Sequence, residues 1–252
     1  MTLARRWRKA IVAGAATAVM AAMTAAVPGV AHADPAHHYY LELGGTGAAA
    51  PAPGCTGSYA FADKHLDGGI PVPVCYPASA GPWLNGRNQF PDPTAPSFDD
   101  SVREGYRNLL AAAEETHRRD PGARLTIVGY SQGAQAADQV LQTIARGESG
   151  IPRSLVSGKL YSDPMQPGTG IWAKLPKGWS AFGFTSPGPG PEKFDGIPVQ
   201  RFCIRTDGVC DATALTSIGG FLAQHPKYQR DGDIMTKTIA QDGGEGVVWY
   251  EP

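Results

Sequence analysis

The stretch that decides the fold is TIVGYSQGAQAADQVL, residues 126–141, where β-favouring residues run into a serine and then into an apolar stretch with helical spacing. Residues 124–130, RLTIVGY, fit a strand buried on both faces. In a nucleophile elbow, a serine lies at a sharp strand-to-helix turn and needs small neighbours. Gly129 and Gly133 meet that need on either side of Ser131. The alternative is a hydroxyl in an ordinary strand-to-helix loop.

The helix expected after this turn begins at Gln132. Its first N–H groups have no partner within the helix, and the positive end of the helix dipole lies there. Both features would stabilise an oxyanion next to Ser131.

Strand and helix patterns alternate along the rest of the chain. Pro71 and Pro73 cannot donate backbone hydrogen bonds, so their strand is expected at a sheet edge. Ser97 can cap the amphipathic helix that follows it. The further expected elements are strands at 37–43, 70–79, 155–163 and 197–207 and helices at 97–118 and 234–241. This alternation predicts a three-layer α/β/α fold with a mostly parallel central sheet.

Composition favours one globular domain. The chain has 252 residues, of which 42% are hydrophobic and 18% charged, so residues 34–252 can enclose a single core. The formal net charge is −1 and no basic stripe is present, which argues against a nucleic-acid partner or an anionic membrane surface. We expect a small or neutral ligand.

The N-terminal segment 1–33 has the pattern of a secretory signal peptide. Basic residues at 5–9 precede an uncharged Ala-rich stretch, and Ala31-His32-Ala33 is a small-x-small cleavage site. The alternative is a membrane anchor, but the stretch contains Ala, Gly and Thr rather than Leu and Ile. We therefore expect a secreted or envelope-associated protein without a stable membrane span after cleavage. The export route stays open.

Four cysteines in an exported chain predict two disulfides. Three pairings are possible, and proximity in the sequence favours Cys55–Cys75 and Cys203–Cys210. No CxxC motif or nearby histidine pair occurs, so a zinc site is not expected.

An acid and a base for Ser131 can be sought at the ends of later strands. Asp207 lies between Cys203 and Cys210, where a disulfide would hold its carboxylate in place, while Asp211 and Asp163 are competing acids. His225 lies in a later loop. The other histidines of the mature chain lie in less suitable places, at His37, His38, His65 and His117.

Taken together, these motifs resemble the cutinase superfamily of secreted α/β serine hydrolases. GYSQGA, the CxxxDxxC loop and HPKYQRDG carry the resemblance, while LGGTG, YPAS, SVREGYRNL and DPMQPGTGI are closer to its PE-PPE-domain branch. It covers about residues 39–233. The resemblance implies a cutinase-like α/β-hydrolase fold with Ser131 as nucleophile, His225 as general base and Asp207 as the acid that orients it.

The same resemblance implies an oxyanion hole. Its first donor is the backbone N–H of Gln132, and its second is Thr46, with Gly45 as the alternative because GGTG can be aligned in two ways. The chain departs from fungal cutinases in two respects. The expected Cys55–Cys75 bridge is more local than theirs, and the stretch from Asp207 to His225 is longer than in small cutinases.

The segment 165–198 is a candidate lid or substrate loop. It is rich in Gly and Pro and carries several aromatic residues, which line an apolar acyl groove or fill a satellite core. The candidate substrate-binding residues are Tyr130, Trp172, Trp179, Phe182 and Phe184.

Three functional hypotheses follow. The first is a secreted serine esterase or lipase that cleaves esters of lipids or polyesters through an acyl-enzyme. The second is an acyltransferase that moves acyl chains between cell-envelope glycolipids, and the third is a non-catalytic envelope-binding domain. None requires a metal or cofactor, and we expect a monomer.

Overall fold

The computed structural model describes residues 37–252 except 49, 50 and 53. The expected signal peptide, residues 1–33, lies outside the described residues. Within the described part, no helix is both long enough and apolar enough to cross a membrane.

The centre of the fold is a six-stranded sheet in which every neighbouring pair is parallel, in the order β2-β1-β3-β4-β7-β8. The strands are β1 (His38–Leu43), β2 (Ile70–Pro73), β3 (Arg124–Tyr130), β4 (Val156–Tyr161), β7 (Val199–Ile204) and β8 (Gly246–Tyr250). A small antiparallel hairpin contains β5 (Ser180–Ala181) and β6 (Phe184–Thr185).

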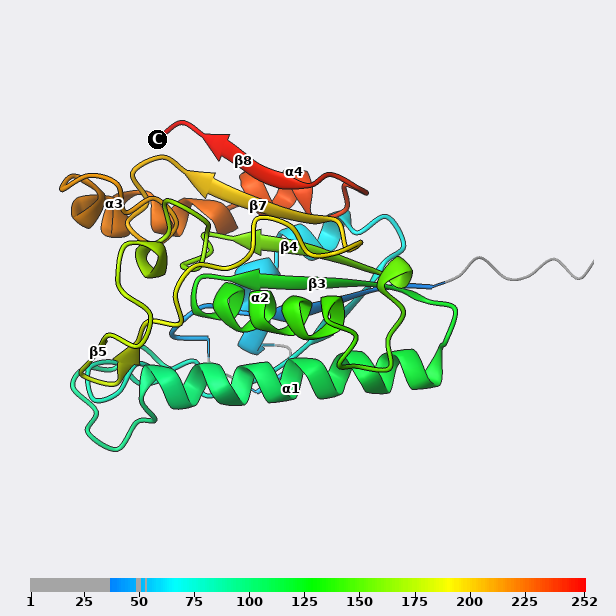
Figure 1. The fold of residues 1–252 in the computed structure, drawn as a ribbon, viewed down its shortest axis with the longest axis horizontal. Coiled ribbons are helices and arrows are strands. Elements are labelled where there is room, and N and C mark those ends of the chain that lie inside the picture. The colour runs from blue at the N-terminus through cyan, green and yellow to red at the C-terminus, as the bar shows by residue number, and fades with distance from the viewer. Residues whose placement is uncertain (1–36, 49–50, 53) are drawn as a thin grey trace, which may run out of the picture. The chain divides into compact units, whose positions relative to one another are not determined.

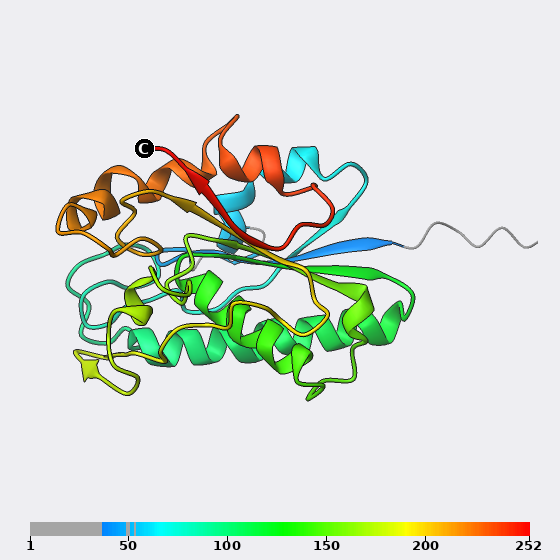
Figure 2. The same cartoon turned by 45° about the horizontal axis from the view of Figure 1, so that its top comes forward.

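Helices cover both faces of this sheet (Figures 1 and 2). The α-helices are α1 (Phe98–Arg119), α2 (Gln132–Ala145), α3 (Ser217–Ala223) and α4 (Ile234–Thr238). The 3-10 helices are η1 (Gly54–Tyr59), η2 (Ala62–His65), η3 (Arg153–Leu155), η4 (Ile171–Ala173) and η5 (His225–Gln229). Helices α1 and α2 pack on one face, while α4, η2 and η5 lie on the other. The predicted three-layer α/β fold is therefore confirmed.

Each face of the sheet has its own apolar core. Alternating residues of β1 show this division, because Leu41 and Leu43 join the core under α1 and α2, whereas Tyr40 joins the core beneath α4. Because all six strands are parallel, their carboxyl ends lie at the same edge of the sheet. Parallel α/β sheets carry their ligand-binding and active sites at this edge.

Strand β2 lies at the edge of the sheet, as its prolines predict, but it ends at Pro73 rather than at residue 79. The N–H of Val74 donates to Glu42 O on β1 at 3.0 Å, so the backbone nitrogens of Pro71 and Pro73 face away from the sheet. The prolines thus interrupt no hydrogen bond with β1.

Three elements near the C-terminus differ from the sequence-based expectation. Helix α3 and strand β8 are present although neither was expected, and α4 ends at Thr238 instead of residue 241. Helix α3 contains Gly219 and Gly220, which weaken helix propensity. A Cβ on Gly220 would overlap the carbonyl oxygen of Thr206, so this glycine permits the helix to pack directly on that backbone.

Candidate active site

Ser131 lies at the tight turn between β3 and α2. Its backbone has φ 56° and ψ −118°, a conformation that L-residues rarely adopt. A Cβ on Gly129 would come within 2.6 Å of Ala134 Cα, and one on Gly133 would overlap the carbonyl oxygens of Leu43 and Gly44. Both flanking glycines are therefore required by close backbone packing, as in a nucleophile elbow.

His225 lies between Ser131 and Asp207. Its Nε2 is 2.8 Å from Ser131 Oγ, and its Nδ1 is 3.1 Å from both carboxylate oxygens of Asp207. The three side chains come from the ends of β3 and β7 and from the start of η5. Ser131 is 9% exposed, His225 8% and Asp207 0%, so the arrangement is almost closed to bulk water.

Asp207 accepts hydrogen bonds from several neighbours besides His225. Ser162 donates to Oδ2 at 2.6 Å, Tyr228 donates to Oδ2 at 2.9 Å, and the N–H of Val209 donates to Oδ1 at 3.1 Å. Burial alone would raise the pKa of Asp207, but the hydrogen bonds and charge of His225, with the bonds from Ser162 and Val209, outweigh burial and lower that pKa. Asp207 is thus held as a carboxylate.

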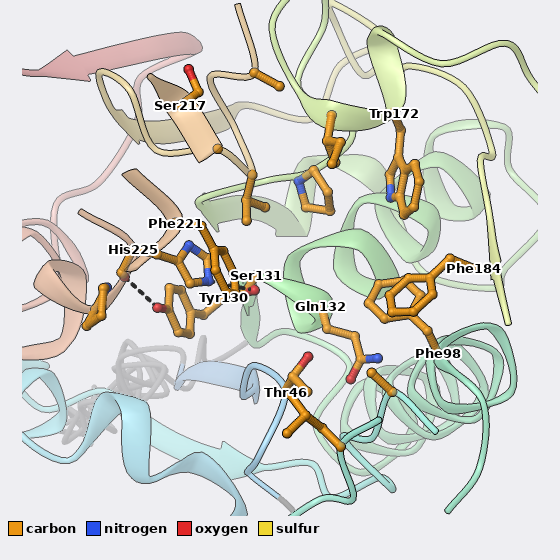
Figure 3. Close-up of a pocket in the computed structure, with 18 of the residues that line it drawn as sticks. Thr46, Phe98, Tyr130, Ser131, Gln132, Trp172, Phe184, Ser217, Phe221 and His225 are labelled. Atoms are coloured by element: carbon orange, nitrogen blue, oxygen red, sulfur yellow. Dashed lines mark hydrogen bonds between the residues drawn. The ribbon is translucent and has the colours of Figure 1, made fainter. Parts of the chain in front are cut away.

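The Asp207 loop and the His225 ring are also fixed by covalent and packing contacts. The predicted Cys203–Cys210 disulfide closes the loop that carries Asp207, and the predicted Cys55–Cys75 disulfide is present as well. Tyr130 stacks on His225 at 5.0 Å between ring centroids, and its hydroxyl donates to His225 O at 2.6 Å (Figure 3).

The competing acids are engaged elsewhere. Arg201 forms buried ion pairs with Asp163 at 2.9 Å and with Asp138 at 2.7 Å. Asp211 accepts a hydrogen bond from Thr206 N–H at 2.8 Å. Of these acids, only Asp207 hydrogen-bonds to His225 among the described residues.

The turn after β1 lies against Ser131 on the side opposite His225 in Figure 3. A Cβ on Gly45 would be 3.3 Å from Ser131 Cβ, and Thr46 lines the same cavity as Ser131. The Gln132 side chain is buried, accepts from Tyr76 OH at 3.1 Å and donates to Ser79 O at 2.8 Å. These contacts fix the first residue of α2, whose backbone N–H has no intrahelical partner.

A cavity of about 1020 Å³ opens above Ser131. Tyr130, Trp172 and Phe184 line it, as expected, but Trp179 and Phe182 do not. The Trp179 side chain is 46% exposed and that of Phe182 75% exposed, and the two residues lie just before β5 and between β5 and β6. A role for these two residues in substrate binding stays a prediction, and the cavity lining does not include them.

Segment 165–198, the candidate lid or substrate loop, contributes Ile171, Trp172 and Phe184 to the wall of this cavity. Trp172 Nε1 donates to Gln135 Oε1 at 2.7 Å, and the N–H of Ile171 donates to Val209 O at 2.9 Å. Phe184 stacks on Phe98 of α1 at 4.7 Å. Trp172 and Phe184 of this segment thus serve both expected roles, since they pack in the core and line the cavity.

The sequence patterns did not single out Ser162, Tyr228 or α3. Ser162 stands at the end of an expected strand, and Tyr228 follows His225 by three residues, so proximity to candidate residues was the available signal. For α3, the available signal was the apolar character of Leu215 and Phe221 between Asp207 and His225. Among the described residues, no group of three or more His, Cys, Asp or Glu could hold a metal ion.

Comparison with solved structures defines the class of fold. A cutinase-like protein from Cryptococcus sp. is 18% identical, with a TM-score of 0.52 over 83% of this chain and 97% of that one. An acetyl xylan esterase is 17% identical, with a TM-score of 0.50 over 83% of this chain and 100% of the other. The protein has a cutinase-like α/β hydrolase fold.

Within this class, residues 69–215 match the PE-PPE domain, and the chain belongs to the PE-PPE domain family. An uncharacterised PPE family protein of Mycobacterium tuberculosis is 26% identical over 141 residues. The match covers 52% of this chain but 21% of the relative, so the chain spans about a fifth of that protein's length.

Proposed function

We propose that the protein is an exported serine esterase that hydrolyses apolar carboxylic esters through an acyl-enzyme. One observation carries this proposal: His225 bridges Ser131 Oγ, at 2.8 Å from Nε2, and the Asp207 carboxylate, at 3.1 Å from Nδ1. This is the arrangement by which a histidine activates a serine and a carboxylate holds the histidine in the required tautomer.

In the first half-reaction, Ser131 Oγ attacks the ester carbonyl carbon while its proton moves to His225 Nε2. Asp207 stabilises the imidazolium that forms. The tetrahedral intermediate then collapses, its bond to the leaving alcohol breaks, and His225 Nε2 returns the proton to that alcohol. The acyl group is left as an ester of Ser131.

The negative charge on the tetrahedral intermediate needs donors that are already in position. The Gln132 backbone N–H is the first, at the start of α2, and Thr46 or Gly45 supplies the second from the turn that packs against Ser131. Each such donor typically stabilises the transition state by about 3 kcal/mol.

The second half-reaction repeats these steps with a new acceptor. Water, deprotonated by His225, attacks the acyl-enzyme and releases the acid, and Ser131 recovers its proton. An acceptor alcohol in place of water would give the acyltransferase alternative. The signal-peptide pattern predicted at 1–33 and the two disulfides support a secreted or envelope location.

The test is hydrolysis of p-nitrophenyl esters of increasing chain length by the wild type and Ser131→Ala. We expect kcat to fall by at least about 10⁴-fold in the variant, because the nucleophile is lost. Ser149→Ala, at a half-buried serine outside the cavity lining, is the control. Turnover that survives Ser131→Ala would contradict the assignment, and a supplied alcohol that becomes acylated would identify transfer.

A further inference from the structure

We propose that the site takes esters whose alcohol part, like the acyl part, is apolar, and that the alcohol lies beneath α3. This inference rests on the proposed function and names the substrate class of the same site. It would make α3, together with the segment that leads into it, a subsite for a hydrophobic leaving alcohol.

Chemistry identifies the side of the cavity on which the alcohol must lie. The leaving oxygen receives its proton from His225 Nε2, so it must come within hydrogen-bonding reach of that nitrogen. The carbonyl oxygen points instead to the donors at Gln132. The alcohol therefore extends along the His225 side of Ser131, and the acyl chain extends away from it.

The His225 side is lined by apolar groups from the segment between the Cys203–Cys210 loop and η5. Phe221 of α3 stacks on His225 at 5.1 Å between ring centroids, and it lies beside His225 and Tyr130 in Figure 3. Leu215 and Ala212 line the cavity from the same segment, and Pro226 lines it from η5. Leu215 is 89% exposed and Phe221 49%, so apolar surface is available there to an alcohol chain.

The side of the cavity proposed for the acyl chain is lined by a second, separate group of aromatic residues. Phe98 contacts Phe184 and Trp172, with ring centroids 4.7 and 6.1 Å apart, and Figure 3 places these rings across Ser131 from Phe221. Ser131 consequently lies between two apolar walls. An ester with one apolar arm would leave one of these walls facing water.

The polar groups on the α3 side are already engaged within the protein. Thr213 Oγ1 donates to Asp211 Oδ1 at 2.6 Å, Ser217 Oγ accepts from Ala214 N–H at 3.4 Å, and Gln229 Nε2 donates to Tyr130 OH at 3.5 Å. No Asp, Glu, Lys or Arg is among the described residues that line the cavity. A polyhydroxylated alcohol such as a sugar would find few free partners, which favours an aliphatic or aromatic alcohol.

The test varies the alcohol and keeps the acyl group constant. Butanoate esters of ethanol, butanol and hexanol give the same acyl-enzyme and have leaving alcohols of similar reactivity, and acid release is followed by pH-stat titration. We expect kcat/KM to rise by about tenfold or more from the ethyl to the hexyl ester, because methylenes of the alcohol become buried against α3.

Two matched variants separate the two walls. In Phe221→Ser, kcat/KM for the hexyl ester should exceed that for the ethyl ester by about threefold or less, while the dependence of kcat/KM on acyl length should stay as in the wild type. In Phe184→Ala, the dependence on acyl length should weaken, while the preference for the hexyl ester over the ethyl ester should stay as in the wild type. Phe61→Ser is the control, because Phe61 is 41% exposed and lies outside the cavity lining. Thermal unfolding of each variant verifies folding, and Leu215→Ser provides a second change on the α3 side at a largely exposed position.

The outcomes distinguish this inference from the proposed function. The alcohol subsite alone would be overturned if the wild type showed Ser131-dependent turnover that did not change with alcohol length. It would also be overturned if Phe221→Ser and Leu215→Ser both kept the wild-type ratio of kcat/KM between the hexyl and ethyl esters. Turnover that is indifferent to Ser131→Ala would overturn the proposed function itself.

Discussion

Ser162 hydrogen-bonds to both Asp207 and His225, the two partners of Ser131. Its hydroxyl donates to Asp207 Oδ2 at 2.6 Å and lies 2.9 Å from His225 Nδ1, so it can accept that N–H. Ser162 has φ 51° and is fully buried, and it is absent from the cavity lining. It is therefore a positioning residue that acts through Asp207 and His225.

We predict that Ser162→Ala lowers kcat by about 10- to 100-fold and leaves KM nearly unchanged. Loss of a hydrogen bond to a charged group typically costs about 1.5–3 kcal/mol, and Ser162 does not touch the substrate cavity. Steady-state kinetics with one p-nitrophenyl ester provide the measurement. Ser157→Ala is the control, since Ser157 is also on β4 and hydrogen-bonds to Thr126 away from the site. An unaltered kcat would show that Ser162 is dispensable.

Sequence reasoning could find Ser131 because its neighbours in the chain define the turn. It could not find Ser162 or Tyr228, because their importance comes from hydrogen bonds to Asp207 across 45 and 21 residues of sequence. Composition likewise could not show that Trp179 and Phe182 lie outside the cavity lining, because it does not give the direction in which a loop presents its side chains.

Among the elements, the contact between α2 and the turn after β1 controls the geometry around Ser131. Gly133, in the first turn of α2, lies directly against the carbonyl oxygens of Leu43 and Gly44. The same turn continues into Gly45 and Thr46. A shift of this turn would move the proposed second oxyanion donor relative to Ser131.

We predict that Gly133→Ala lowers the free energy of unfolding by about 1–3 kcal/mol and lowers kcat by at least about tenfold. The added methyl group would overlap backbone atoms that cannot rotate away, so the β1 turn must move. Urea unfolding and esterase kinetics measure the two effects. A Cβ on Gly150 would meet nothing within 4 Å, so Gly150→Ala should change neither quantity. Full activity in Gly133→Ala would mean that the turn tolerates displacement.

Elements with strong local patterns were predicted well, and those held by tertiary contacts were not. The 3.6-residue spacing of α1 and the buried run of β3 give their positions within one or two residues. By contrast, α3 has seven residues and two glycines, and β8 has five residues after a Gly-rich stretch. Their stability comes from packing against the Asp207 loop and from pairing with β7.

At the scale of the whole molecule, one buried carboxyl makes stability depend on pH. Glu42 of β1 is 0% exposed, and burial, followed by the charge of Asp63, raises the pKa of Glu42 well above its usual range. The folded protein thus keeps this proton at pH values where the unfolded chain has lost it. The stabilisation is complete below the unfolded pKa, near 4.3, and is lost as pH rises toward the folded pKa.

We predict that Glu42→Gln is more stable than the wild type at pH 8 and that its free energy of unfolding falls less steeply between pH 5 and 8. One such proton gives a slope of at most about 1.4 kcal/mol per pH unit. Urea unfolding at several pH values provides the measurement, with the exposed Glu104→Gln as control. Equal slopes for the wild type and Glu42→Gln would contradict the raised pKa of Glu42.

The prolines of β2 also affect how copies of this protein meet one another. An exposed strand edge can recruit a strand from another molecule because its outward N–H and C=O groups lack partners. On β2, Pro71 and Pro73 occupy the two outward-facing donor positions, so an incoming strand would find carbonyl acceptors there but no donors. Extension of the sheet from molecule to molecule is thereby disfavoured at β2, and β8 is the edge at which it remains open.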